Sequence, residues 1–132
     1  MTILFYTELL DDVGKRLLEV ICKANRQGQV EVHQKIDGLH HRLCQLTQKP
    51  AVIILRAPNR DCLNSLLAEN KLMRDANIIL VLPAWDQEMT SLGHLFRPRF
   101  LTFEDNSFED IASVVKKIQR RGAGGNQPSL SG

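Results

Sequence analysis

Three charged side chains follow apolar runs of the sequence. Arg56 comes after VIIL, Glu8 after ILFYT and Glu104 after FLTF. Runs of this length are typical of buried strands, and functional groups of parallel α/β folds gather where such strands end. We therefore expect the three residues to share one edge of a sheet. An arginine there can form an ion pair with a carboxylate or, alternatively, bind an anion.

The elements that must position these residues are read from hydrophobic periodicity. Short apolar runs alternate with stretches in which apolar residues recur every three or four positions. The runs at 52–55 and 78–82 are continuous, which is typical of parallel strands covered on both faces. Strand–helix alternation with short connections predicts a parallel sheet with right-handed crossovers. The apolar runs are 3–6, 30–32, 51–55, 78–82 and 100–103, and the helical patterns span 10–24, 39–46, 63–73, 89–96 and 108–118.

Polar residues predict where four of the helices begin. Asp37 and Asp86 are expected to cap the second and fourth helices, and Asn59 or Asp61 the third. The fifth is expected to begin at Ser107, with an acidic residue three positions later in a pattern close to a capping box.

The chain is expected to form one domain over residues 1–121. Its 132 residues are 43% apolar, which is enough for a substantial core. The segment 122–132, GAGGNQPSLSG, is rich in glycine, serine and proline, and we expect a flexible tail.

Five strand–helix units in this length resemble the receiver domain of bacterial response regulators. The resemblance covers residues 1 to about 121 and is one of pattern and length. It implies a flavodoxin-like three-layer α/β sandwich around a five-stranded parallel sheet of order 2-1-3-4-5. Helices one and five should cover one face, and helices two, three and four the other.

The chemical motifs of that family are missing at the matching positions. Receivers end their first strand in an acidic pair, where this chain has Thr7 and Glu8. Arg56 stands at the place of the phospho-accepting aspartate. Pro83 replaces a hydroxyl residue after the fourth strand, and Glu104 replaces a lysine after the fifth. The resemblance therefore implies a vestigial acidic pocket.

Phosphoryl transfer to a carboxylate needs Mg²⁺ held by acids, a cation on the developing charge and a hydroxyl on the phosphoryl oxygens. An arginine cannot accept the group, and its charge opposes Mg²⁺ binding. Asp61, beyond the loop, is an imperfect substitute acceptor. We expect Arg56 to pair with Glu8 on the neighbouring strand rather than with Glu104, two strands away; the acidic pair Asp11-Asp12 comes one helical turn later.

His40 and Cys44 are one helical turn apart, a spacing that can hold a metal ion, and His41 lies beside them. No third ligand is close in sequence. We therefore interpret this group as two exposed histidines beside a small thiol rather than as a metal site, and we predict no metal or cofactor. The chain has three cysteines, Cys22, Cys44 and Cys62, and none of them belongs to a CxxC pair. This pattern fits free thiols in a reducing cytoplasm.

Two functions are compatible with these patterns. The first is a stand-alone, non-enzymatic pseudo-receiver, a phosphorylation-independent interaction module in bacterial signalling or regulation. Its partner is expected to be a protein, with a second copy of the chain as one candidate. The expected partner face, taken from the resemblance, comprises Phe96, Arg97, Arg99, Glu109 and Lys116.

The alternative is a small flavodoxin-like enzyme or anion-binding protein that uses Glu8, Arg56, Asp61 and Asp86 at the carboxyl edge. Neither hypothesis involves a membrane, because no apolar run approaches the roughly 20 residues that a spanning helix needs. The acidic start of the chain is unlike a signal peptide. The basic residues near the end of the fifth helix are interpreted as a solvated helix end, so nucleic acid is not an expected partner.

Overall fold

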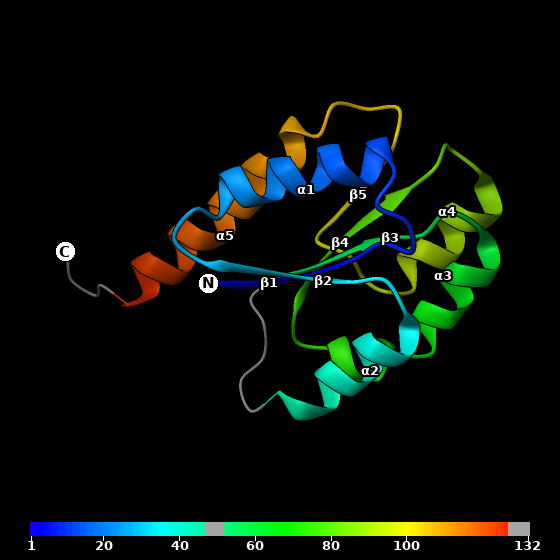
Figure 1. The fold of residues 1–132 in the computed structure, drawn as a ribbon, viewed down its shortest axis with the longest axis horizontal. Coiled ribbons are helices and arrows are strands. Elements are labelled where there is room, and N and C mark those ends of the chain that lie inside the picture. Colours follow the sequence, from blue (N-terminus) through cyan, green and yellow to red (C-terminus); the bar gives the residue numbers. More distant parts are fainter. Residues whose placement is uncertain (47–51, 127–132) are drawn as a thin grey trace.

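The computed structural model describes residues 1–46 and 52–126, with side chains up to residue 120 in the last helix. Its strands all run parallel in the order β2-β1-β3-β4-β5, as predicted (Figure 1). The strands are β1 (Thr2–Tyr6), β2 (Gln29–His33), β3 (Val52–Arg56), β4 (Asn77–Leu82) and β5 (Phe100–Phe103). The helices are α1 (Asp12–Ala24), α2 (Ile36–Gln45), α3 (Arg60–Leu67), the 3-10 helix η1 (Asn70–Met73), α4 (Gln87–His94) and α5 (Glu109–Asn126).

Two layers of helices cover the sheet. Alternate residues of β1 point to opposite faces, so Ile3 and Phe5 pack with α1 and α5, whereas Leu4 and Tyr6 pack with α2, α3 and α4. The continuous apolar runs of β3 and β4 fill both cores in the same way. The predicted distribution of helices, one and five against two, three and four, is confirmed (Figure 1).

Side-chain caps fix where the helices begin. Asn59 accepts a hydrogen bond from the backbone N–H of Cys62 and Asp86 from that of Met89, as predicted for α3 and α4. The cap predicted for α2 is wrong: the helix begins at Ile36, and Asp37 lies in its first turn. An acidic residue in the first turn also complements the positive end of the helix dipole. Asp37 therefore still marks the start of α2, although it lies two residues after the cap position, Lys35.

The last helix differs from expectation at both ends. It begins at Glu109 rather than Ser107, whose Oγ accepts a hydrogen bond from the backbone N–H of Glu109 at 3.2 Å. It runs on to Asn126, into the segment that was expected to be a tail from residue 122. The remainder of that segment, 127–132, lies outside the described residues. Across the described part of the chain, no helix combines the length and the apolar character that crossing a membrane requires.

The register of the sheet brings the ends of four strands to one edge. Tyr6 pairs with Leu55 in β3, Arg56 with Val81 in β4, and Leu82 with Phe103 in β5. The residues that follow these strands therefore lie side by side across the carboxyl edge.

Candidate functional site at the carboxyl edge

Arg56 is the last residue of β3 and is buried, with 6% of its surface exposed. A guanidinium cannot lose its charge under ordinary conditions, so burial requires acceptors for its N–H groups and a compensating negative charge. Both are supplied by residues that are distant in sequence.

Asp11 provides the strongest contact. Its two carboxylate oxygens accept hydrogen bonds from Nη1 and Nη2 of Arg56 at 2.9 and 3.1 Å, a bidentate arrangement. Nη1 also lies 3.1 Å from Thr7 Oγ1 and 3.2 Å from the carbonyl oxygen of Leu9. The Thr7 hydroxyl is itself oriented, because it donates to the Leu9 carbonyl at 2.8 Å.

Asp11 is held in place because it also caps α1. Its Oδ1 accepts a hydrogen bond from the backbone N–H of Gly14 at 2.8 Å. Gly14 leaves room for this arrangement: a Cβ atom there would lie 2.7 Å from the Leu9 carbonyl oxygen and 3.2 Å from Arg56 Nη1. The hydrogen bonds from Arg56 and Gly14 lower the pKa of Asp11.

Glu104 closes the other side of the guanidinium. Its Oε2 accepts a hydrogen bond from Arg56 Nε at 3.0 Å, and 18% of its side chain is exposed. Adjacent strands lie about 4.8 Å apart, so the contact spans roughly 10 Å across the end of β4. Two long side chains bridge this distance. The bonds to Asp11 and Glu104 outweigh the opposing effect of burial and raise the pKa of Arg56.

The predicted Arg56–Glu8 ion pair is wrong. The Thr7 side chain is fully buried against Arg56, whereas the next residue, Glu8, is exposed. Glu8 Oε2 lies 3.5 Å from the Tyr6 hydroxyl, whose pKa is raised by burial. Alternation of side chains at the end of β1 thus turns Glu8 away from the site.

Asp11 was missed as the partner because it lies beyond the strand end, in the loop before α1. The spacing of Asp11 three residues before Gly14, ahead of an amphipathic stretch, is the pattern of an N-cap. That signal, combined with the position of α1 above the sheet edge, could have identified it.

The other predicted pocket positions take no part in the Arg56 contacts. Pro83 is half-buried directly after β4. Asp61 is exposed in the first turn of α3, and Asp86 is occupied as the cap of α4. The N–H groups of Arg56 donate to acceptors of the protein itself, and two carboxylates surround the single positive charge. The site therefore has little capacity to bind an additional anion.

The expected partner face is only partly exposed. Phe96 is buried in the core, with 4% of its surface exposed, because it packs beneath the end of α4. Leu95, its neighbour, is 57% exposed instead. The charged members of the face are all exposed: Arg97, Arg99, Glu109 and Lys116.

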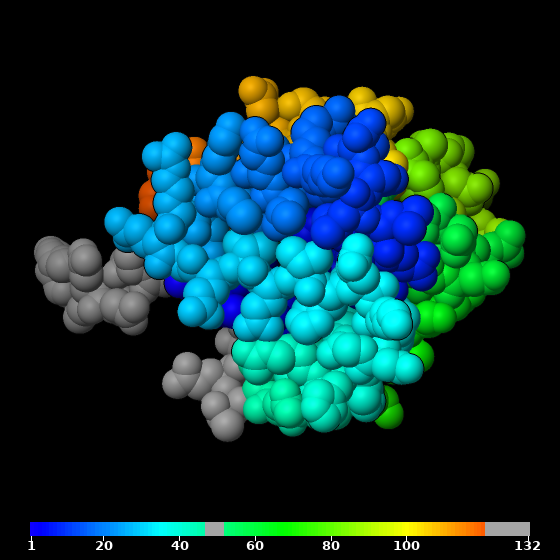
Figure 2. Space-filling view, viewed as in Figure 1, coloured from blue at the N-terminus to red at the C-terminus, as the bar shows by residue number. Residues whose placement is uncertain are grey.

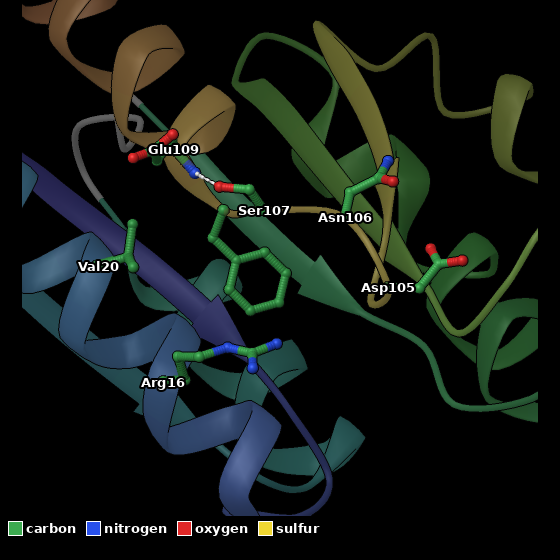
Figure 3. Close-up of a pocket in the computed structure, with 7 residues that line it drawn as sticks. Arg16, Val20, Asp105, Asn106, Ser107 and Glu109 are labelled. Atoms are coloured by element: carbon green, nitrogen blue, oxygen red, sulfur yellow. Dashed lines mark hydrogen bonds between the residues drawn. The ribbon is translucent and has the colours of Figure 1, made fainter.

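A separate hollow lies between α1 and the loop before α5 (Figure 3). The guanidinium of Arg16 stacks over the Phe108 ring there, 4.9 Å from its centre. Asp105 and Glu109 lie at the same hollow, and none of the residues that contact Arg56 lines it. Among the described residues there is no group of three or more His, Cys, Asp or Glu side chains that could hold a metal ion.

No protein-family model matches this sequence, and no curated protein matches it significantly. Its structure is similar to solved receiver domains. The signal receiver domain of a DNA-binding response regulator from Colwellia psychrerythraea 34H matches with a TM-score of 0.73 and 10% identity, covering 91% of this chain and 98% of that one.

Two further structures show the same likeness. A CheY-like response regulator from Mesorhizobium loti matches with a TM-score of 0.68 and 16% identity, over 89% of this chain and 97% of that one. A response regulator from Burkholderia pseudomallei was solved with a phosphorylated aspartic acid, a calcium ion and citrate. It matches with a TM-score of 0.65 and 13% identity, over 92% of this chain and 72% of that one. The chain therefore has the flavodoxin-like fold of CheY-like receiver domains.

Removal of the Arg56 side chain tests the contribution of this site to stability. Arg56→Ala leaves two carboxylates without their cation, and we expect it to lower the free energy of unfolding by about 3 kcal/mol. Urea denaturation measures the loss. The matched control is Arg60→Ala, since Arg60 binds Glu88 at 2.8 Å with both side chains more than half exposed. That change should cost about 1 kcal/mol or less. Equal losses for the two variants would contradict a stabilising role for the buried pair.

The lowered pKa of Asp11 predicts a pH dependence. A carboxyl group with a depressed folded-state pKa contributes stability above its unfolded value, about 3.9, and loses that contribution as the pH falls through the folded value. Asp11→Asn should therefore be less stable than the wild type at pH 7, and the difference should shrink below about pH 4. Urea denaturation across this range measures it, with Asp12→Asn, an exposed neighbour, as control. A difference that stays constant down to pH 2 would count against the Asp11–Arg56 interaction.

Proposed function

We propose that this chain is a pseudo-receiver: a non-enzymatic protein-interaction module of bacterial signalling or regulation that works without phosphorylation. The single observation that carries the proposal is the buried Arg56, which stands where the resemblance places the phospho-accepting aspartate. Glu104 stands where the resemblance places a lysine. The charges at the ends of β3 and β5 are thus reversed relative to that pattern, and they bind each other at 3.0 Å.

This reversal of charge is incompatible with Mg²⁺ binding and phosphoryl transfer at the end of β3, whereas the side chains still fill the space at the sheet edge. Mg²⁺ binding requires a cluster of oxygen ligands with spare negative charge, and a fixed guanidinium in the middle of the carboxylates repels the ion. The Burkholderia pseudomallei structure carries both a phosphorylated aspartic acid and a calcium ion. In this chain the end of β3, where the resemblance places the phospho-accepting aspartate, carries a cation that is bound to Asp11 and Glu104.

The proposed partner surface comprises Leu95, Arg97, Arg99, Glu109 and Lys116, which are exposed at the end of α4, before β5 and on α5. It modifies the expected face by replacing the buried Phe96 with Leu95. Arg97 has a left-handed backbone, with φ of 52°, which is uncommon for a residue with a side chain. The proposed partner is a protein, with a second copy of the chain as one form. A cytoplasmic location fits such a module.

Treatment with acetyl phosphate and Mg²⁺ tests the loss of phosphoryl chemistry. The wild type should gain no phosphoryl group by intact mass, whereas a receiver with an aspartate at the end of β3 should be modified in parallel. Arg56→Asp gathers carboxylates where the cation was, so millimolar Mg²⁺ should raise its melting temperature. Arg60→Asp, at an exposed site, should not respond. A phosphoryl adduct on the wild type that disappears in Asp61→Ala would show that Asp61 is an acceptor and that the proposal is wrong.

Charge reversal tests the partner surface. Arg99→Glu combined with Lys116→Glu should reduce the capture of protein partners from extracts of the native organism, because it inverts the charge of the proposed surface. Lys15→Glu combined with Arg26→Glu makes the same change at exposed positions in and just after α1. Quantitative mass spectrometry compares the two, with and without acetyl phosphate. Capture that depends on acetyl phosphate, or that the α1 pair reduces equally, would speak against the proposal.

A further inference from the structure

A second group of reactive side chains lies on α2 and just before η1, on the opposite face of the sheet from α1. His40 and Cys44 are on α2, and Glu69 immediately precedes η1. The Nδ1 atom of His40 is hydrogen-bonded to Glu69 Oε1. Its other ring nitrogen, Nε2, lies 3.5 Å from the sulfur of Cys44, within hydrogen-bonding distance for a thiol.

The chemistry of the three groups fixes the direction of these hydrogen bonds. An ionised carboxylate can only accept, so a neutral His40 bonded to Glu69 carries its proton on Nδ1 and donates it. The lone pair of Nε2 then faces Cys44 and accepts from the thiol. The order is carboxylate, imidazole, thiol, in which a positioned base faces a nucleophile.

The surroundings hold the imidazole and leave the sulfur accessible. The Glu69 side chain is 15% exposed, and its backbone is fixed by hydrogen bonds from Glu69 N–H to the Leu66 carbonyl and from Leu72 N–H to the Glu69 carbonyl. The His40 side chain is 53% exposed, and Cys44 is exposed. α2 lies on the surface of the molecule, so a small molecule can reach it (Figure 2).

We propose that Cys44 is a thiol-modification site that takes low-molecular-weight disulfides, with His40 as its general base and Glu69 as the residue that positions His40. In the reaction, His40 Nε2 accepts the proton of the thiol, and the Cys44 sulfur attacks one sulfur of the disulfide. The S–S bond breaks, a mixed disulfide forms on Cys44, and the leaving thiolate takes the proton. The disulfide is the oxidant, so no other co-reactant is needed.

The other two cysteines of the chain serve as internal controls for the reactivity of Cys44. Cys22 is exposed on α1, which is remote from α2 across the sheet. Cys62 is buried in the first turn of α3, and burial raises its pKa to about 12, so its thiol stays protonated at neutral pH. Exposure alone predicts equal reactivity for Cys22 and Cys44, whereas the proposal predicts that Cys44 reacts faster.

The experiment treats the reduced full-length protein with oxidised glutathione at pH 7 in the presence of a metal chelator. Peptide mapping after an acid quench gives the modification rate of each cysteine. We expect Cys44 to react roughly tenfold faster than Cys22. His40→Gln should bring the rate at Cys44 down to about that at Cys22, because the base is lost.

His41→Gln is the matched control. His41 adjoins His40 on α2, and its Nε2 contacts Gln45 at 3.0 Å through the same one-turn spacing. Its substitution should leave the Cys44 rate unchanged. Similar rates at Cys44 and Cys22 in the wild type, or equal effects of the two histidine variants, would overturn the proposal.

The role of Glu69 needs a readout that a general loss of structure would not give. Nitrogen-15 NMR of the imidazole should show His40 protonated at Nδ1 in the wild type, and Glu69→Ala, which removes the acceptor, should reduce the population of this tautomer together with the Cys44 rate. The signals of His41 should stay the same. A His40 tautomer that does not change in Glu69→Ala would show that Glu69 has no positioning role.

Discussion

A charged guanidinium buried at the end of the central strand is the constraint on which the carboxyl edge of this protein depends. Arg56 must find compensation for the loss of water around its charge, and it finds it in Asp11 and Glu104. These residues come from the two sides of the sheet edge, so one side chain links the β1–α1 loop, β3 and the end of β5. Removing one partner from such a network leaves an uncompensated charge, which is why its members act together.

The same constraint explains local features of the chain. Asp11 serves both Arg56 and the first turn of α1, and Gly14 has no side chain that would collide with the Leu9 carbonyl or crowd the guanidinium. Thr7 turns its hydroxyl inward, where it accepts from Arg56 and donates to Leu9. The conformation of the β1–α1 loop is therefore tied to the charge on the neighbouring strand.

The parallel strand–helix architecture could be predicted from sequence because the apolar pattern is repeated along the chain, and the continuous runs of β3 and β4 are typical of a sheet covered on both faces. The strand order followed from the resemblance to receiver domains. The position of Arg56 followed from the same pattern. The partners of Arg56 could not be predicted in the same way, because the adjacency of β1 and β3 favoured Glu8. The direction of each side chain, and the reach of Glu104 across β4, depend on the three-dimensional arrangement of the strand ends. Phe96 was misjudged for a related reason: a residue just past a short helix can point inward or outward, and the sequence pattern does not distinguish the two.

The proposed function has a consequence for how such a module can be regulated. A switch needs two states of similar free energy and a ligand or modification that favours one of them. A carboxylate that gains a phosphoryl group changes its charge, but a guanidinium that is always protonated does not. With Arg56 bound on both sides, the carboxyl edge has one favoured arrangement, and under the proposed function the partner surface is permanently available. Any control of the module must then come from another part of the molecule, and α2 and η1, with their exposed thiol, lie on a face of the sheet that this ion pair leaves free.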